Sequence, residues 1–116
     1  MSHAISQRRF QLWFYRVSHG QLLIRSPKSD TEATNYDLMF FGVVFMHLPT
    51  IFEGIEIVDA NPDELQHIQK MKVPYGQMLR PYILSSADNR YWVAANSFET
   101  DENDLDIFDS KLDIKR

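Results

Sequence analysis

Four histidines are the first candidates for chemistry, because the chain has no cysteine to supply a thiol nucleophile, a disulfide or a thiolate metal ligand. His47 ends the most apolar segment, where folding could bring it to Glu53 or Glu56 and form an acid–base pair or a weak metal site. No two histidines have the His-x-x-x-His spacing of a metal site. We therefore interpret His47 as a structural residue at a strand end and expect no metal and no cofactor.

Catalytic motifs are otherwise absent from the sequence. The chain has no G-x-S-x-G, no P-loop, no dinucleotide glycine pattern and no His-Glu-x-x-His, and it has only four glycines. The segment that begins at Asp101 fails the calcium-loop pattern, since Leu105, Asp106 and Leu112 stand where a ligand oxygen, a glycine and a glutamate are required. We interpret residues 99–104 as a solvated acidic loop and expect that the protein is not an enzyme.

Aromatic side chains on expected strands carry the strongest remaining signal. Tyrosine and tryptophan are favoured where one end of the side chain is buried and the other is wet. Their strands are apolar on both faces, which predicts either a self-association or ligand surface or an ordinary core between packed layers. The candidate ligand or interface residues are Trp13, Tyr15, Tyr82, Tyr91 and Trp92, together with His47.

Strands must position these side chains, and the first expected hairpin joins residues 10–17 to residues 21–26. The three residues between the strands end in Gly20, which accepts a left-handed conformation without a Cβ penalty. A three-residue loop of this kind predicts that Phe14 pairs with Ile24 across the hairpin.

Further strands follow along the chain. Residues 36–48 form the most apolar segment and predict a strand buried on both faces. Thirteen residues is long for one strand, and Gly42 at its centre predicts a bulge or a sharp bend. Another strand is expected over residues 52–59. Residues 80–85 and 90–98 predict a second hairpin.

One short helix is expected over residues 62–71. Asn61 can cap it, Pro62 suits its first position, and Glu64 completes the spacing of a capping box. Residues 105–114 permit either helical or strand spacing, and both alternatives stay open.

On the second hairpin, strand alternation places Trp92 and Phe98 on one face.

These elements predict a mainly β fold, with α+β as the alternative class. About six strands in adjacent hairpins indicate an antiparallel β-sandwich or a strongly bent, partly closed barrel, with one short helix near residues 62–71. A parallel sheet would need helical crossovers between its strands, and a single expected helix is too few to supply them. The 116 residues fit a single domain, with residues 1–8 and the last few residues flexible.

Charge and composition bound the function. The net charge is −4, so we expect no nucleic-acid partner. No apolar run approaches the ~20 residues of a membrane helix, so we expect a cytoplasmic protein without a membrane partner. The first hypothesis is a non-enzymatic interaction module, either a homo-oligomer such as a homodimer or a subunit bound to a protein partner, because one short helix cannot cover the apolar strand faces. A small-molecule-binding β fold is the second hypothesis, and an enzyme with a His–carboxylate site around His47 is the third.

Overall fold

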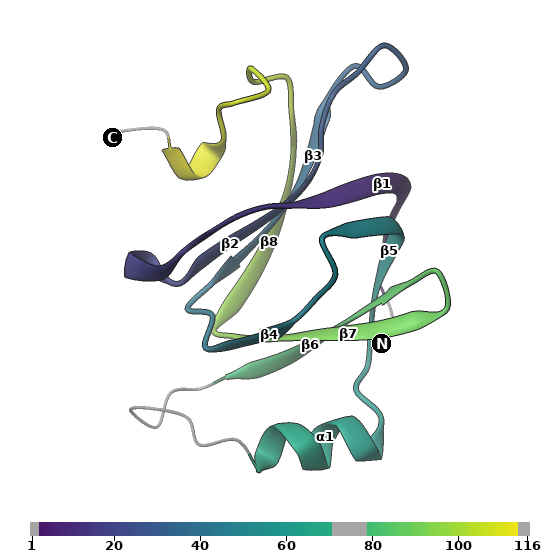
Figure 1. Cartoon of the computed structure of the whole chain (residues 1–116), viewed down its shortest axis with the longest axis vertical. Coiled ribbons are helices and arrows are strands. Elements are labelled where there is room, and N and C mark those ends of the chain that lie inside the picture. The colour runs from purple at the N-terminus through teal and green to yellow at the C-terminus, as the bar shows by residue number, and fades with distance from the viewer. Residues whose placement is uncertain (1–2, 71–78, 114–116) are drawn as a thin grey trace.

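The computed structural model describes residues 3–70 and 79–113. These residues form a single curved antiparallel sheet of eight strands, with one α-helix at its end (Figure 1). The strand order is β4-β7-β6-β5-β1-β2-β3-β8, and the sheet does not close into a barrel. The elements are β1 His3–Arg16, β2 Gln21–Ser26, β3 Asn35–Phe41, β4 Phe45–His47, β5 Ile51–Val58, α1 Pro62–Gln69, β6 Arg80–Ser86, β7 Asn89–Ala95 and β8 Ser97–Asn103.

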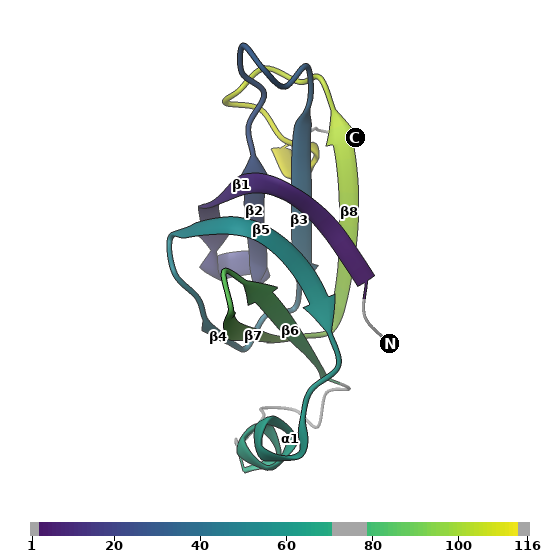
Figure 2. The same cartoon turned by 90° about the vertical axis from the view of Figure 1, so that its right-hand side faces the viewer.

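The predicted class is confirmed: the fold is mainly β, antiparallel, and carries one short helix. All eight strands belong to one bent sheet, where about six strands were predicted (Figure 2). The described helix is too short to cross a membrane.

The inner face of the curved sheet holds the hydrophobic core. Side chains from six of the strands meet there and are almost completely shielded from water, and each fully buried large side chain contributes about 1.5–3 kcal/mol. The residues that are at most 1% exposed in this cluster are Phe10, Leu22, Ile24, Leu38, Phe40, Phe52, Leu84, Val93 and Ala95.

Gly42 marks the corner at which the predicted strand 36–48 divides into β3 and β4. Its φ is +67°, and a Cβ there would lie 2.4 Å from the side-chain nitrogen of Asn96. Asn96 is the matching corner between β7 and β8, and its backbone N–H donates to the carbonyl oxygen of Phe41 at 2.9 Å. The predicted bend is therefore confirmed, and it occurs within one sheet.

Two predictions for the residues after the corner at Asn96 are wrong. Phe98 turns inward and lies against Phe40, with ring centroids 4.8 Å apart, so the predicted face shared with Trp92 is wrong. The corner interrupts the alternation that a continuous strand would have. The predicted acidic loop over residues 99–104 is also wrong, because residues 99–103 belong to β8 and pair with β3.

The β1–β2 hairpin has the predicted left-handed glycine but a different register. Gly20 has φ +57° and follows a 3₁₀ turn at Val17–His19, so four residues connect the strands instead of three. Phe14 therefore pairs with Leu23 and not with Ile24 as predicted. A register shift between Leu12 and Phe14 adds a bulge.

Helix α1 begins as predicted. The side chain of Asn61 accepts a hydrogen bond from the backbone N–H of Glu64 at 2.8 Å, and the Glu64 carboxylate accepts one from the N–H of Asn61 at 2.8 Å. This reciprocal capping box satisfies two N–H groups that a helix start would otherwise leave unbonded. The described helix ends at Gln69, and the predicted last residue, Met71, lies outside the described residues.

Candidate interaction surface

The five predicted aromatic residues divide between the two faces of the sheet. The side chains of Tyr15, Tyr82 and Tyr91 pack against the core on the inner face. Burial raises the pKa of the Tyr82 hydroxyl, and nearby Arg80 lowers it by less. Trp13 and Trp92 are half-buried and lie outside this core cluster. The set therefore does not form one surface, and the two tryptophans have different surroundings.

Trp92 is the centre of an aromatic patch formed by Phe45, His47, His67 and Trp92. The ring of Trp92 lies 5.0 Å from His47, 5.3 Å from His67 and 6.3 Å from Phe45, measured between ring centroids. Strands β4 and β7 supply three of the rings, and α1 supplies His67. The indole nitrogen of Trp92 is buried and has no hydrogen-bond partner in the structure as described. A buried N–H without a partner is costly, so the patch is an incompletely satisfied part of the surface.

The His47 ring contacts aromatic side chains. Its exposed ring stacks on Trp92 and lies 6.4 Å from Tyr91. Glu53, one of the two acids considered as its partner, instead lies 3.3 Å from the guanidinium of Arg9. Among the described residues, histidines and acids form no group of three that could hold a metal ion.

An opening in the sheet lies beside the aromatic patch, between β1 and β4. Residues 12–16 of β1 pair only with β2, and β4 pairs only with β7, within the described part of the chain. Two backbone hydrogen bonds border the opening, from Leu12 to Thr50 at 2.8 Å and from Val43 to Gly20 at 3.0 Å. We name this opening, from residues 12–16 across to residues 44–48, the β1–β4 seam.

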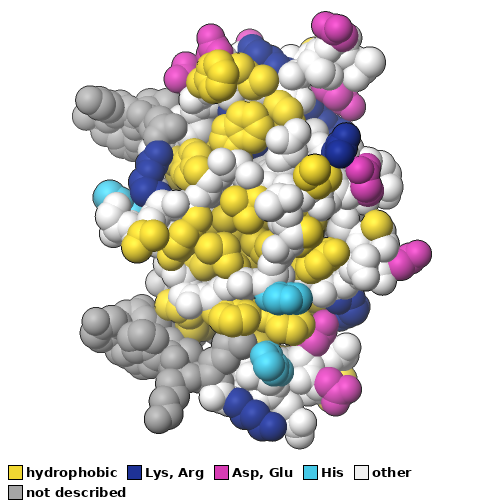
Figure 3. Space-filling model, in the orientation of Figure 1, with side chains coloured by type: hydrophobic (Ala, Val, Ile, Leu, Met, Phe, Trp, Pro, Cys, Tyr) yellow, Lys and Arg dark blue, Asp and Glu magenta, His cyan; other side chains and the backbone are white. Residues whose placement is uncertain are grey.

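Hydrophobic side chains fill the seam. Leu12, Met46 and Leu48 are partly buried against the core, and Val44 is 45% exposed. The space-filling view shows a broad hydrophobic area between β1 and β4, with histidine side chains below it (Figure 3). Because residues 38–52 contain no Asp, Glu, Lys or Arg, no full charge from this segment protects the β4 edge.

The edge at the opposite end of the sheet has the contrary chemistry. Strand β8 carries Glu99, Asp101 and Glu102, of which Glu99 and Glu102 are exposed. Charged side chains on an edge strand oppose pairing with a second chain. The two edges therefore differ, with an acidic β8 and an uncharged β4.

A buried ion pair organises the outer side of β2 and β3. The guanidinium of Arg25 donates to both carboxylate oxygens of Asp37, at 2.6 and 2.9 Å, and both side chains are completely buried. Arg25 also donates to the carbonyl oxygen of Ile107 at 2.9 Å, and its guanidinium lies over the ring of Trp13. Asn103 donates to Asp37 at 3.0 Å. These bonds hold the C-terminal segment against the sheet.

Sequence reasoning missed this pair, although a signal was present. Arg25 and Asp37 stand directly opposite each other on the strands that flank residues 27–34. Pairing those two strands as a hairpin would have placed opposite charges on one face of an apolar sheet. The C-terminal segment is neither of the two predicted alternatives, since beyond β8 its described residues contain only a 3₁₀ turn at Lys111–Asp113.

A second ion pair fastens α1 to the sheet. The carboxylate of Glu64 accepts two hydrogen bonds from Arg90 of β7, at 2.9 and 2.8 Å. Arg90 also donates to the carbonyl oxygen of Asp59 at 2.9 Å. The hydrogen bonds from Arg90 lower the pKa of Glu64 below its ordinary value of 4.5, partly opposed by burial, and the same bonds raise the pKa of Arg90.

Comparisons with known protein families, with curated proteins and with solved structures found no match to this chain.

Proposed function

We propose that this protein is a non-enzymatic interaction module that forms a two-fold dimer through its β4 edge and the adjoining aromatic patch. The observation that carries the proposal is the edge strand β4, which has no charged residue and pairs with β7 on one side only among the described strands. Beside it lies the half-buried Trp92, whose indole N–H has no partner among the described residues. Unpaired edge backbone is a template for another strand. A partner there would cover the exposed apolar surface around the half-buried ring of Trp92.

A second copy of the chain suits this edge because the pairing is complementary to itself. In an antiparallel pair of β4 strands centred on Met46, Phe45 of one copy stands opposite His47 of the other. This arrangement repeats between copies the kind of aromatic–imidazole contact that Trp92 makes with His47 and His67 within one copy. It also brings no like charges together, whereas the same operation on β8 would oppose acidic side chains.

Strand pairing alone would not hold such a dimer. β4 has only three residues, and each backbone hydrogen bond between the two strands would contribute only about 0.5–1.5 kcal/mol net. A specific interface buries about 1,200–2,000 Å² in total, so the dimer must also cover the seam and the patch. Val44, which is 45% exposed beside β4, supplies further apolar area.

Light scattering at micromolar concentration tests the proposal, and we expect a dimer mass. Val44→Lys and His47→Lys each place a lysine of both copies near the two-fold axis, so we expect the dissociation constant to rise by about tenfold or more. Both side chains are exposed, so folding should survive, which circular dichroism checks. Glu99→Lys changes charge on β8 and is the matched control that should remain dimeric.

Two results would contradict the proposal. A monomer mass at every concentration and salt condition would show that the chain does not self-associate. A dimer that Glu99→Lys disrupts and Val44→Lys leaves intact would place the contact on another surface.

A further inference from the structure

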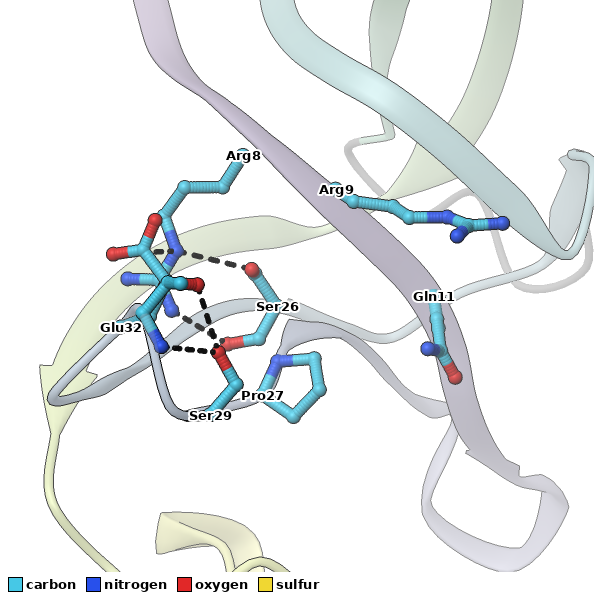
Figure 4. Close-up of a pocket in the computed structure, with 8 residues that line it drawn as sticks. Arg8, Arg9, Gln11, Ser26, Pro27, Ser29 and Glu32 are labelled. Atoms are coloured by element: carbon cyan, nitrogen blue, oxygen red, sulfur yellow. Dashed lines mark hydrogen bonds and ion pairs between the residues drawn. The ribbon is translucent and has the colours of Figure 1, made fainter.

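A pocket of about 240 Å³ opens where β1 and β2 diverge (Figure 4). β1 pairs with β2 only from Gln11 onward, so the preceding residues leave a space beside the loop that follows β2. Polar and charged side chains line this space. They include Arg8, Arg9 and Gln11 from β1 and Ser29, Thr31 and Glu32 from the loop.

Arg8 is held in place by neutral oxygen atoms. Its Nε donates to the hydroxyl of Ser26 at 3.0 Å, and its Nη2 donates to the carbonyl oxygens of Ser26 at 3.2 Å and Thr34 at 2.5 Å. These bonds use three of the five N–H groups of a guanidinium. The two on Nη1 have no hydrogen-bond partner among the residues that the structure describes.

The side chain of Arg8 is only 12% exposed, yet no carboxylate lies within hydrogen-bond distance of it among the described residues. The carboxylate paired with it belongs to Glu32, which is 45% exposed and whose oxygen lies 3.8 Å from Nε, beyond hydrogen-bond distance. Arg25, by contrast, has a carboxylate at 2.6 Å. A charge removed from water is unfavourable unless an opposite charge approaches it closely.

We propose that this pocket binds a small oxyanion, a carboxylate or a phosphate group, at the guanidinium of Arg8. Arginine donates strong, charge-assisted hydrogen bonds to both groups. The hydroxyls of Ser29 and Thr31, 3.2 Å apart at the exposed side, add donors. The volume is below the roughly 300–1,000 Å³ of pockets for drug-sized ligands, so the ligand has few heavy atoms. Glu32 occupies the rim and competes with it.

Titration of the isotope-labelled protein with sodium acetate or inorganic phosphate, followed by NMR at constant ionic strength kept with sodium chloride, tests the proposal. Saturable shifts of the Arg8 Nε–H signal and of the backbone amides of residues 28–34 are expected. Saturation by acetate alone identifies a carboxylate ligand, and saturation by phosphate alone identifies a phosphate ligand. Absence of saturation with both anions overturns the proposal.

Matched variants separate a built site from general attraction of anions. We expect Arg8→Gln to weaken binding by about tenfold or more, because it removes the charged donor. Arg80→Gln removes the same charge from an exposed position at the start of β6 and should leave the affinity unchanged. Equal loss in both variants would overturn the proposal.

Glu32→Gln keeps the test decisive if Arg8→Gln does not fold. This exposed loop substitution removes the competing carboxylate, so we expect anion affinity to rise about threefold or more. A structural role for Arg8 alone predicts no such rise. Unchanged or weaker binding by Glu32→Gln would contradict the proposal.

Discussion

The outer side of the sheet is covered in different ways at its two ends. Over β2 and β3, the segment after β8 is held by the Arg25–Asp37 pair, whose side chains are both 0% exposed. Beside β7, helix α1 is held by the Arg90–Glu64 pair, whose side chains are 39% and 9% exposed. Both covers use an arginine with a two-bonded carboxylate, but water reaches only the second pair.

This difference shows where the molecule is complete and where it is open. At the first end, Trp13 lies under the Arg25 guanidinium and the acidic β8 edge opposes further pairing. At the second end, Trp92 keeps an indole N–H without a partner in the described structure, and β4 offers an uncharged edge. The first end is closed by a completely buried pair, whereas the second end is the surface that we propose for the dimer.

Asp37→Asn should produce the largest effect on the completed end. It leaves the guanidinium of Arg25 buried without a counter-charge, which costs about 3–5 kcal/mol of unfolding free energy. Urea denaturation measures the loss.

The double variant Arg25→Met/Asp37→Leu sharpens this test, because it removes the buried charges together. We expect it to be more stable than Asp37→Asn alone. If the double variant is the less stable of the two, the hydrogen bond of Arg25 to Ile107 and its contact with the Trp13 ring contribute more to stability than the charge of Asp37 does.

Gly20→Val should have the next largest effect, at the junction between the two ends. Gly20 has φ +57°, which a β-branched residue resists, and a Cβ would lie 3.2 Å from the backbone nitrogen of Val43. We expect a loss of about 1–3 kcal/mol in a denaturation experiment. An unchanged midpoint would show that the hairpin loop does not need the left-handed conformation.

Local chemistry made part of this fold predictable. The capping box at Asn61 and Glu64, the left-handed conformation of Gly20 and the bend at Gly42 follow from single residues or short spacings, and the structure has all of them. The turn of the second hairpin was also expected, and Ala87 and Asp88 have the positive φ values of a tight hairpin turn.

Long-range partners explain what the sequence did not reveal. The bulge at Trp13 adds a residue to β1 without any local signal, and the register of Phe14 differs from the predicted one. Strand β8 alternates too weakly to be distinguished from a loop, because its acidic side chains hide its pairing with β3. The Arg8 pocket needs Thr34 and Ser26 brought to one guanidinium, which only the folded chain does.

Glu64→Gln should have a smaller effect on the open end. The substitution keeps an oxygen that can accept from Asn61 but removes the charge that faces Arg90. We expect a loss of about 1 kcal/mol, because Arg90 is more than a third exposed and water screens the pair. A loss as large as that of Asp37→Asn would contradict the distinction between the two pairs.

Acid should bring the stabilities of the wild type and of Glu64→Gln closer together. Because the folded-state pKa of Glu64 lies below 4.5, its stabilisation is fully present above that pH and is lost as the pH falls through the lowered pKa. The stability difference between the wild type and the variant should therefore shrink below pH 4.5. Denaturation midpoints from neutral to acidic pH measure it, and a constant difference would be the contrary result.

The two tryptophans give the smallest and most direct comparison. Trp92→Phe removes ring area but also removes a buried N–H that has no partner among the described residues, and these changes partly offset each other. Trp13→Phe has no such relief and weakens the contact with Arg25. We therefore expect Trp92→Phe to cost less by about 1 kcal/mol when the protein is dilute. If the indole N–H of Trp92 bonds to a second copy, this advantage should disappear at concentrations where the dimer forms.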